Sequence, residues 1–209
     1  MQQDKEVIIE ILNKFQWHYR RFDVCRMSFS DLLKIFNNNQ SNILLKTCFL
    51  SIKDIEILDS QIPSKDLLIN PYQFSLYSKR FVRVNPSLWD SFKNMSRELT
   101  KYNGRKAKIV SGYRSPAYQS MLYLKEIYVH KFNIEATKKI IKLPGQSQHQ
   151  DYENLAIDIR DTKSRQMLSN SSYDWLMQNS EKYKFINTYP NAKNKDGIIY
   201  EPWHWHFIS

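Results

Sequence analysis

The sequence predicts an α+β fold in which helices precede and flank a small, mainly antiparallel sheet. Apolar residues recur at helical spacing over residues 4–21, short strand patterns appear at 108–110 and 155–159, and 198–208 is rich in aromatic residues. The chain of 209 residues fits one domain or a domain with a helical appendage. With 42% hydrophobic and 14% aromatic residues, a disordered chain is excluded.

The N-terminal part of the chain is predicted to be helical. A second helix over 31–36 would end at the asparagine run 37–39, and the segment 43–58 fits either a strand or a helix. The first helix, over 4–21, would place five large side chains on one face: Val7, Ile8, Ile11, Phe15 and Tyr19.

In the second part of the chain, helices and short strands alternate. Pro86 opens a helix over 87–102 that Asn103 and Gly104 close, and Pro116 opens another that reaches about residue 129. Further helical pieces are predicted at 134–141 and 172–182, and strands at 108–110, 155–159 and 198–208.

The net charge of +10 lies entirely in the second part of the chain. Residues 1–60 contain eight basic and eight acidic side chains, whereas 61–209 contain 23 and 13. We therefore predict a helical N-terminal extension at 1–60 and a second domain at 61–209. The basic excess suits an anionic partner, such as nucleic acid or a cell-wall polymer, or a solvated basic surface.

No segment resembles a membrane span or a secretory signal. The most apolar run, 43–52, contains Lys46 and is much shorter than a span, and the N-terminus is polar. The expectation is a protein without a transmembrane segment, either cytoplasmic or exported by lysis or another non-classical route. Cys25 and Cys48 form no disulfide framework and are expected to be ordinary thiols.

Candidate metal ligands gather in the last third of the sequence. His149 follows a Pro-Gly break, and Asp158 lies on a predicted strand whose other face is apolar. His204 and His206 would share one face of the last strand. Two histidines and an aspartate with a fourth position open to water would form a catalytic zinc site, where zinc lowers the pKa of the water. Core and surface packing is the alternative.

Two charged residues could complete such a site. Glu201 could carry a proton from water to a leaving amine, although Pro202 makes its position in the strand impossible to derive from spacing. Arg114 could face a developing oxyanion or form an ordinary salt bridge. An alternative function is nucleic-acid binding, which would not depend on a metal and so would be unaffected by chelators. Only the positive net charge supports this alternative.

Three segments resemble the signature motifs of the VanY-type D-alanyl-D-alanine carboxypeptidases. They are Ser111-Gly112-Tyr113-Arg114-Ser115 with Gln119, then Ser147-x-His149 leading to Ala156-x-Asp158, and finally Glu201-Pro202-Trp203-His204-Trp205. The family belongs to a zinc peptidase group that includes VanX dipeptidases, phage L-alanyl-D-glutamate endolysins and hedgehog domains. The resemblance covers residues 64–209.

The resemblance implies a hedgehog/DD-peptidase-like fold with one zinc ion on His149, Asp158 and His204. Glu201 would be the catalytic base, and Arg114 would bind the substrate carbonyl or oxyanion. The implied substrate is a peptidoglycan stem peptide or another peptide containing D-Ala-D-Ala, and nucleic acid is not an expected partner. Supporting or substrate-binding roles would fall to Ser111, Tyr113, Ser115, Gln119, Ser147, Trp203 and His206.

The second motif departs from the family pattern. The family usually has glycine three residues after the first histidine and aspartate seven after it, whereas here Asp158 comes nine after His149. The longer loop could still deliver both ligands. It also brings two further carboxylates, Asp151 and Glu153, either of which could replace Asp158 as the oxygen ligand.

The best interpretation is a zinc-dependent D,D-carboxypeptidase that releases terminal D-alanine. Within the same chemistry, a peptidoglycan endopeptidase of the endolysin type and a VanX-like dipeptidase remain alternatives. From another class, a non-catalytic zinc-binding interaction module is compatible with the hedgehog resemblance.

Overall fold

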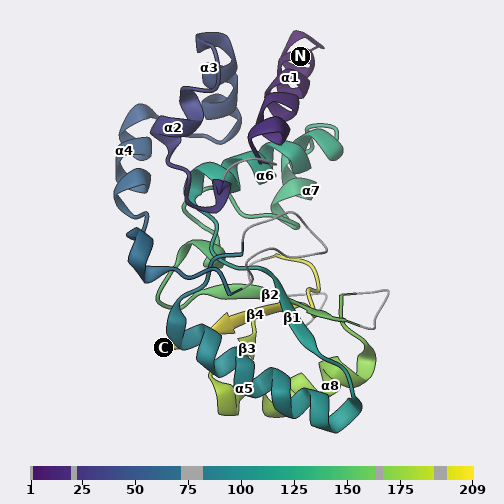
Figure 1. The fold of residues 1–209 in the computed structure, drawn as a ribbon. Coiled ribbons are helices and arrows are strands. Elements are labelled where there is room, and N and C mark those ends of the chain that lie inside the picture. Colours follow the sequence, from purple (N-terminus) through teal and green to yellow (C-terminus); the bar gives the residue numbers. More distant parts are fainter. Residues whose placement is uncertain (1, 20–22, 72–81, 163–166, 191–196) are drawn as a thin grey trace. The chain divides into compact units, whose positions relative to one another are not determined.

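The computed structural model describes residues 2–19, 23–71, 82–162, 167–190 and 197–209 (Figure 1). The chain forms two compact units. The first contains residues 1–62 and 114–147, and the second contains 82–113 and 148–209 together with the segment that begins at Pro63. The predicted domain boundary at residue 60 stays a prediction, and the two units differ from it by grouping 114–147 with the N-terminal helices.

The regular secondary structure in the described residues of the first unit is entirely helical. Its segment 43–58, which fitted either a strand or a helix, is divided between two helices because two capping boxes start them. The side chains of Asn37 and Gln40 begin one, and those of Ser51 and Asp54 begin the other. The helices are α1 (Gln2–Tyr19), α2 (Phe29–Leu33), α3 (Asn38–Thr47), α4 (Ile52–Ser60), α6 (Pro116–Val129) and α7 (Ile134–Lys138), with a 3-10 turn at Val24–Arg26.

The core of the first unit forms where α1 packs on α6. Ile8 and Ile11 of α1 are buried, as the helical spacing of these residues predicted, and they belong to one cluster with Met121 and Leu124 of α6. Burial of such a face is what stabilises helices of this length. Both cysteines lie in this unit as buried thiols outside any disulfide, and burial raises the pKa of the Cys48 thiol far above its ordinary value.

The second unit contains a four-stranded antiparallel sheet with the order β1-β2-β4-β3. This confirms the predicted α+β class. Its elements are α5 (Pro86–Asn103), β1 (Ala107–Ser111), β2 (Ala156–Asp161), α8 (Asn170–Asn179), β3 (Phe185–Asn187) and β4 (His204–Phe207), with 3-10 turns at Lys65–Leu67, Gln148–Gln150 and Ser180–Tyr183.

The last strand is shorter than the sequence predicted. The expectation of a strand over 198–208 is wrong for 198–203 and for 208. Pro202 begins a tight turn before the strand, in which the His204 N–H donates to the Glu201 carbonyl. The short strand β3 was not predicted. It pairs with β4 in register, with Ile186 opposite His206.

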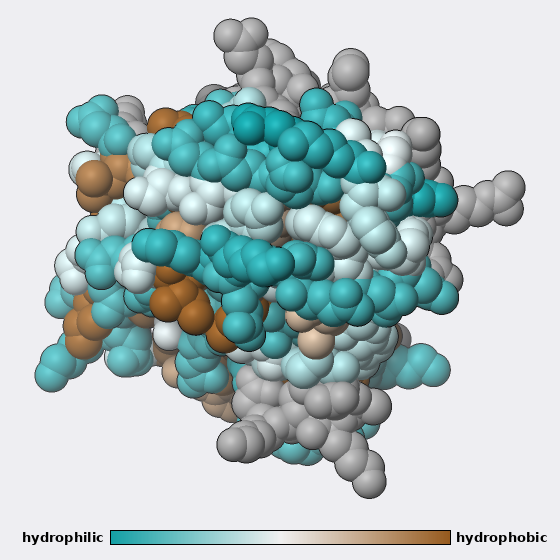
Figure 2. All heavy atoms as spheres, turned by 90° about the horizontal axis from the view of Figure 1, so that it is seen from below, coloured by the Kyte–Doolittle hydropathy of each residue, from teal (hydrophilic) through white to brown (hydrophobic). Residues whose placement is uncertain are grey.

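One face of this sheet is apolar and the other carries the polar residues of interest. Ile157, Ile159 and Trp205 are fully buried in a core with residues of α5 and α8, and both helices lie on the same side of the sheet (Figure 1). Seen from the side of these helices, the surface is mainly hydrophilic (Figure 2). Asp158 and His204 are cross-strand partners whose side chains lie on the opposite face.

The N-terminus of α5 ties the longer loop to the rest of the second unit. The Asn85 side chain caps this helix by accepting the Leu88 N–H, and its amide nitrogen donates to the Tyr152 carbonyl. At the other end Gly104 adopts a left-handed conformation, as the Asn-Gly pair predicted. None of the described helices combines the length and apolar character needed to cross a membrane.

Candidate metal centre

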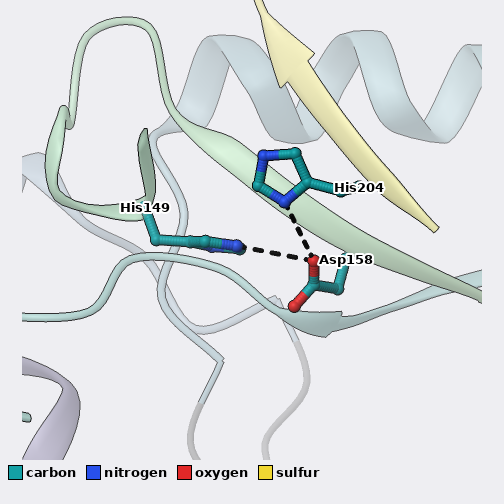
Figure 3. Close-up of side chains that lie close together, drawn as sticks. All are labelled: His149, Asp158 and His204. Atoms are coloured by element: carbon teal, nitrogen blue, oxygen red, sulfur yellow. Dashed lines mark hydrogen bonds and ion pairs between the residues drawn. The ribbon is translucent and has the colours of Figure 1, made fainter. Parts of the chain in front are cut away.

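Three potential metal ligands converge on the polar side of the sheet (Figure 3). His149 lies in the 3-10 turn before β2, Asp158 lies on β2, and His204 lies on β4. One donor atom from each residue lies within 4.8 Å of the others. The three residues are 2%, 9% and 4% exposed, so the donor atoms are largely shielded from water.

Two of the three donor spacings match those of a tetrahedral zinc site. The Asp158 Oδ1 atom lies 3.4 Å from His149 Nε2 and 3.3 Å from His204 Nδ1. Zinc with ligand bonds of about 2.0–2.1 Å in tetrahedral geometry places neighbouring donors about 3.3 Å apart. Two imidazoles and one carboxylate are also the ligand types that catalytic zinc sites use.

Hydrogen bonds orient both imidazole rings toward Asp158. His149 Nδ1 lies 2.9 Å from the Gly112 carbonyl oxygen, and His204 Nε2 lies 2.9 Å from Gln148 Oε1. Both partners are acceptors, so these two nitrogens carry the protons of neutral rings. The other nitrogen of each ring then turns a lone pair toward the carboxylate. Three electron-rich atoms at this distance require a cation or a shared proton between them.

Gly112 explains why the first motif contains a glycine. A Cβ atom at this position would overlap the Arg83 carbonyl oxygen and lie 2.9 Å from a methyl of Val84. The Gly112 carbonyl is the acceptor that orients His149. The close approach of two backbone segments is therefore needed for both packing and ring orientation.

Gly112→Ala is expected to destabilise the protein by about 1–3 kcal/mol and to weaken zinc binding, because the shifted backbone displaces the acceptor of His149. Urea unfolding and chelator competition would measure the two effects. Gly104→Ala is the control, since its left-handed conformation costs stability but its Cβ meets no neighbouring atom. Equal zinc affinities in the two variants would contradict the role given to the Gly112 carbonyl.

Glu201 lies beside the ligand cluster. Its Oε2 atom is 3.8 Å from His204 Nδ1 and the side chain is 14% exposed. The turn at Pro202 brings the two residues to the same side, which an uninterrupted strand would not do. Besides the bond from the His204 N–H, two hydrogen bonds fix the Glu201 backbone, one from the Asn187 side-chain amide to its carbonyl and one from its own N–H to the Tyr189 carbonyl.

Other residues of the predicted site that belong to the second unit make backbone contacts within the sheet region. Ser111 ends β1 opposite Asp158, and the buried Tyr113 donates its N–H to the Arg83 carbonyl. Trp203 lies in the turn before β4, half-buried, with its carbonyl accepting the Ile159 N–H. None of these contacts shows a ligand role.

The remaining predicted residues belong to the first unit, where two have clear structural contacts. Ser115 caps α6 by accepting the Tyr118 N–H, and the buried Gln119 donates its amide to the Lys142 carbonyl. Arg114 and Ser147 are half-buried. The roles of these four residues toward the metal centre stay predictions.

The longer loop leaves Asp158 in the cluster. Asp151 Oδ1 accepts the N–H groups of Glu153 and Asn154, so this carboxylate stabilises the loop itself. Asp151 and Glu153 are exposed, and the described residues give no ligand cluster that includes either one. His206 Nε2 donates to the Asn154 carbonyl at 2.6 Å, and burial lowers the pKa of this histidine.

Sequence reasoning missed two residues that contact the cluster and a third that supports one of them. Gln148 bonds to His204, Thr188 Oγ1 donates to Gln148 Oε1 at 3.0 Å, and the Tyr189 ring lies 5.0 Å from the His204 ring. Only the position of Gln148 next to His149 could have drawn attention to it. Thr188 and Tyr189 follow the unpredicted strand β3, so no sequence pattern connected them with the site.

Comparison with known proteins identifies the family of this chain. The family model for VanY, D-alanyl-D-alanine carboxypeptidase, matches residues 82–209. The chain belongs to the VanY family. A relative in Bacillus subtilis (strain 168), named as the carboxypeptidase YodJ, is 31% identical over 196 residues, which cover 87% of this chain and 67% of that protein.

Solved structures of carboxypeptidases have a similar fold. The LD-carboxypeptidase LdcB is 25% identical with a TM-score of 0.59, over 71% of each chain. A variant of the vancomycin-resistance D,D-pentapeptidase VanY, solved in complex with Zn(II), is 23% identical with a TM-score of 0.56, over 68% of this chain and 78% of that one. These similarities confirm the hedgehog/DD-peptidase-like fold that was expected from the sequence.

Proposed function

We propose that the protein is a zinc-dependent D,D-carboxypeptidase that removes the terminal D-alanine from peptidoglycan stem peptides. The observation that carries the proposal is the buried cluster of His149, Asp158 and His204 with the Glu201 carboxylate beside it, in a chain of the VanY family. The ligand spacing supports one zinc ion on these three residues, with a fourth position open to water or substrate.

The chain's own residues supply the proton transfers. Zinc, when bound, polarises a carbonyl group and makes water a stronger acid. Glu201 takes the proton of the attacking water at its carboxylate and delivers it to the nitrogen of the departing D-alanine. Its fixed backbone and its low exposure keep the carboxylate close to the ligands.

A role for Arg114 in binding the oxyanion is proposed from its sequence motif. Arg114 is the positively charged residue of the motif Ser111-Gly112-Tyr113-Arg114-Ser115. Its guanidinium group is suited to stabilise the negative charge that develops on the carbonyl oxygen of the substrate. The sequence motif is the support for this role.

The decisive experiment compares products by mass spectrometry. Zinc-loaded protein would be incubated with a stem pentapeptide ending in D-Ala-D-Ala, and His204→Ala would serve as the inactive control. The expected result is loss of one alanine by the unmutated protein alone. A cut between inner residues would indicate an endopeptidase, cleavage of free D-Ala-D-Ala alone would indicate a dipeptidase, and intact substrates would favour a non-catalytic zinc module.

A second candidate is an L,D-carboxypeptidase, because LdcB, one of the similar solved structures, has that activity in its name. Such an enzyme cuts the bond between an L and a D residue and therefore requires a tetrapeptide. A matched tetrapeptide that ends in a single D-alanine separates the two specificities. If the enzyme released D-alanine from the tetrapeptide and left the pentapeptide uncleaved, it would be an L,D-carboxypeptidase and not a D,D-carboxypeptidase.

A further inference from the structure

We infer that Gln148 is a positioning residue, which holds the His204 ring in the tautomer and orientation needed for metal binding. The inference rests on the proposed metal centre and adds a residue to it. Gln148 lies in the 3-10 turn Gln148–Gln150, directly before His149, and is half-buried. The same short turn therefore supplies one ligand and the hydrogen-bond partner of another.

The Gln148 amide oxygen is fixed by two donors. His204 Nε2 donates to Oε1 at 2.9 Å, and the Thr188 hydroxyl donates to the same atom at 3.0 Å. Because an amide oxygen can only accept, the His204 nitrogen beside it carries the proton. Thr188 follows β3, so the bond also joins the 3-10 turn to the end of the sheet.

This hydrogen bond has a consequence on the far side of the ring. A neutral imidazole carries one proton, so placing it on Nε2 leaves the Nδ1 lone pair directed at Asp158 Oδ1, 3.3 Å away. Tyr189 packs against the same ring with centroids 5.0 Å apart and limits its rotation. Without the acceptor, Nε2–H would be left unpaired in a buried site or the tautomer would change.

A purely structural role for Gln148 predicts different behaviour. If its amide only joined the turn to Thr188, its loss would lower stability and leave the affinity for metal unchanged. If it positions His204, its loss weakens metal binding by the factor typical of partners that orient a ligating histidine, about 10–100-fold. Metal affinity therefore separates the two roles, whatever the catalytic activity.

The test compares Gln148→Leu, which removes the acceptor, with Gln148→Glu, which keeps one. Zinc affinity would be measured by competition with a chromophoric chelator, and the visible absorption of the Co(II) form would report ligand geometry. Gln148→Leu should bind zinc about 10–100-fold more weakly with an altered Co(II) spectrum, and Gln148→Glu should stay within about threefold of the unmutated protein.

Thr188→Val provides a second variant that leaves Gln148 in place. It should weaken zinc binding less than Gln148→Leu, and the double variant should be no weaker than Gln148→Leu alone, because both changes act through one oxygen. Additive losses, or an unchanged affinity and Co(II) spectrum in a folded Gln148→Leu, would overturn the inference.

His149→Ala distinguishes this inference from the proposed function. If His149→Ala loses zinc while Gln148→Leu keeps it, only the positioning role is wrong. If both variants keep full affinity, the metal centre itself is wrong and the role of Gln148 fails with it. If the expected affinities are found but no peptide is cleaved, the positioning role stands and the peptidase assignment does not.

Discussion

Glu201→Ala is expected to lower peptide hydrolysis by about 10²–10⁴-fold while leaving zinc affinity nearly unchanged. The carboxylate lies 3.8 Å from His204 Nδ1 but does not belong to the cluster of ligand atoms. Its removal therefore deletes the group that moves the proton and leaves the three ligands in place. The loss should appear in kcat, because proton transfer occurs in the transition state.

Steady-state kinetics on the stem pentapeptide and chelator competition would measure these two quantities in the same preparations. Glu153→Ala is the matched control, since it removes an exposed carboxylate from the loop before β2 and should leave kcat unchanged. Full activity in Glu201→Ala would exclude Glu201 as the base. A loss of zinc as large as the loss of activity would instead make Glu201 a ligand.

His204→Ala is expected to remove both zinc binding and hydrolysis. The ring supplies one of three ligands, so its loss should weaken zinc by more than the 10–100-fold typical of a supporting residue. It also leaves Asp158 without its partner at 3.3 Å and Gln148 without the donor at 2.9 Å. Activity should fall to the level of the metal-free protein.

The measurements are zinc content after dialysis, zinc affinity and turnover. His130→Ala is the control because this histidine follows α6 in the first unit and its Nδ1 contacts the Glu126 carbonyl. Zinc affinity within about threefold of the unmutated protein in His204→Ala would remove His204 from the ligand set.

Local signals in the sequence determined most helices of this protein and the chemistry of its site. Ser115 and Pro116 define the start of α6, and Asn85 and Gly104 define the ends of α5, because caps and proline act through neighbouring backbone groups. The motif residues likewise identified His149, Asp158 and His204 as potential ligands. Such information depends on neighbours along the chain, so it can be read without a structure.

Contacts between distant segments were decided only by the tertiary structure. The pairing of β2 with β4 fixes Asp158 opposite His204, so the two extra residues of the preceding loop do not displace Asp158 from the ligand cluster. The turn at Pro202 brings Glu201 beside His204, and the end of β3 reaches Gln148 through Thr188. Spacing along a chain reports the periodicity of one element, whereas these contacts arise from the register and packing of several elements.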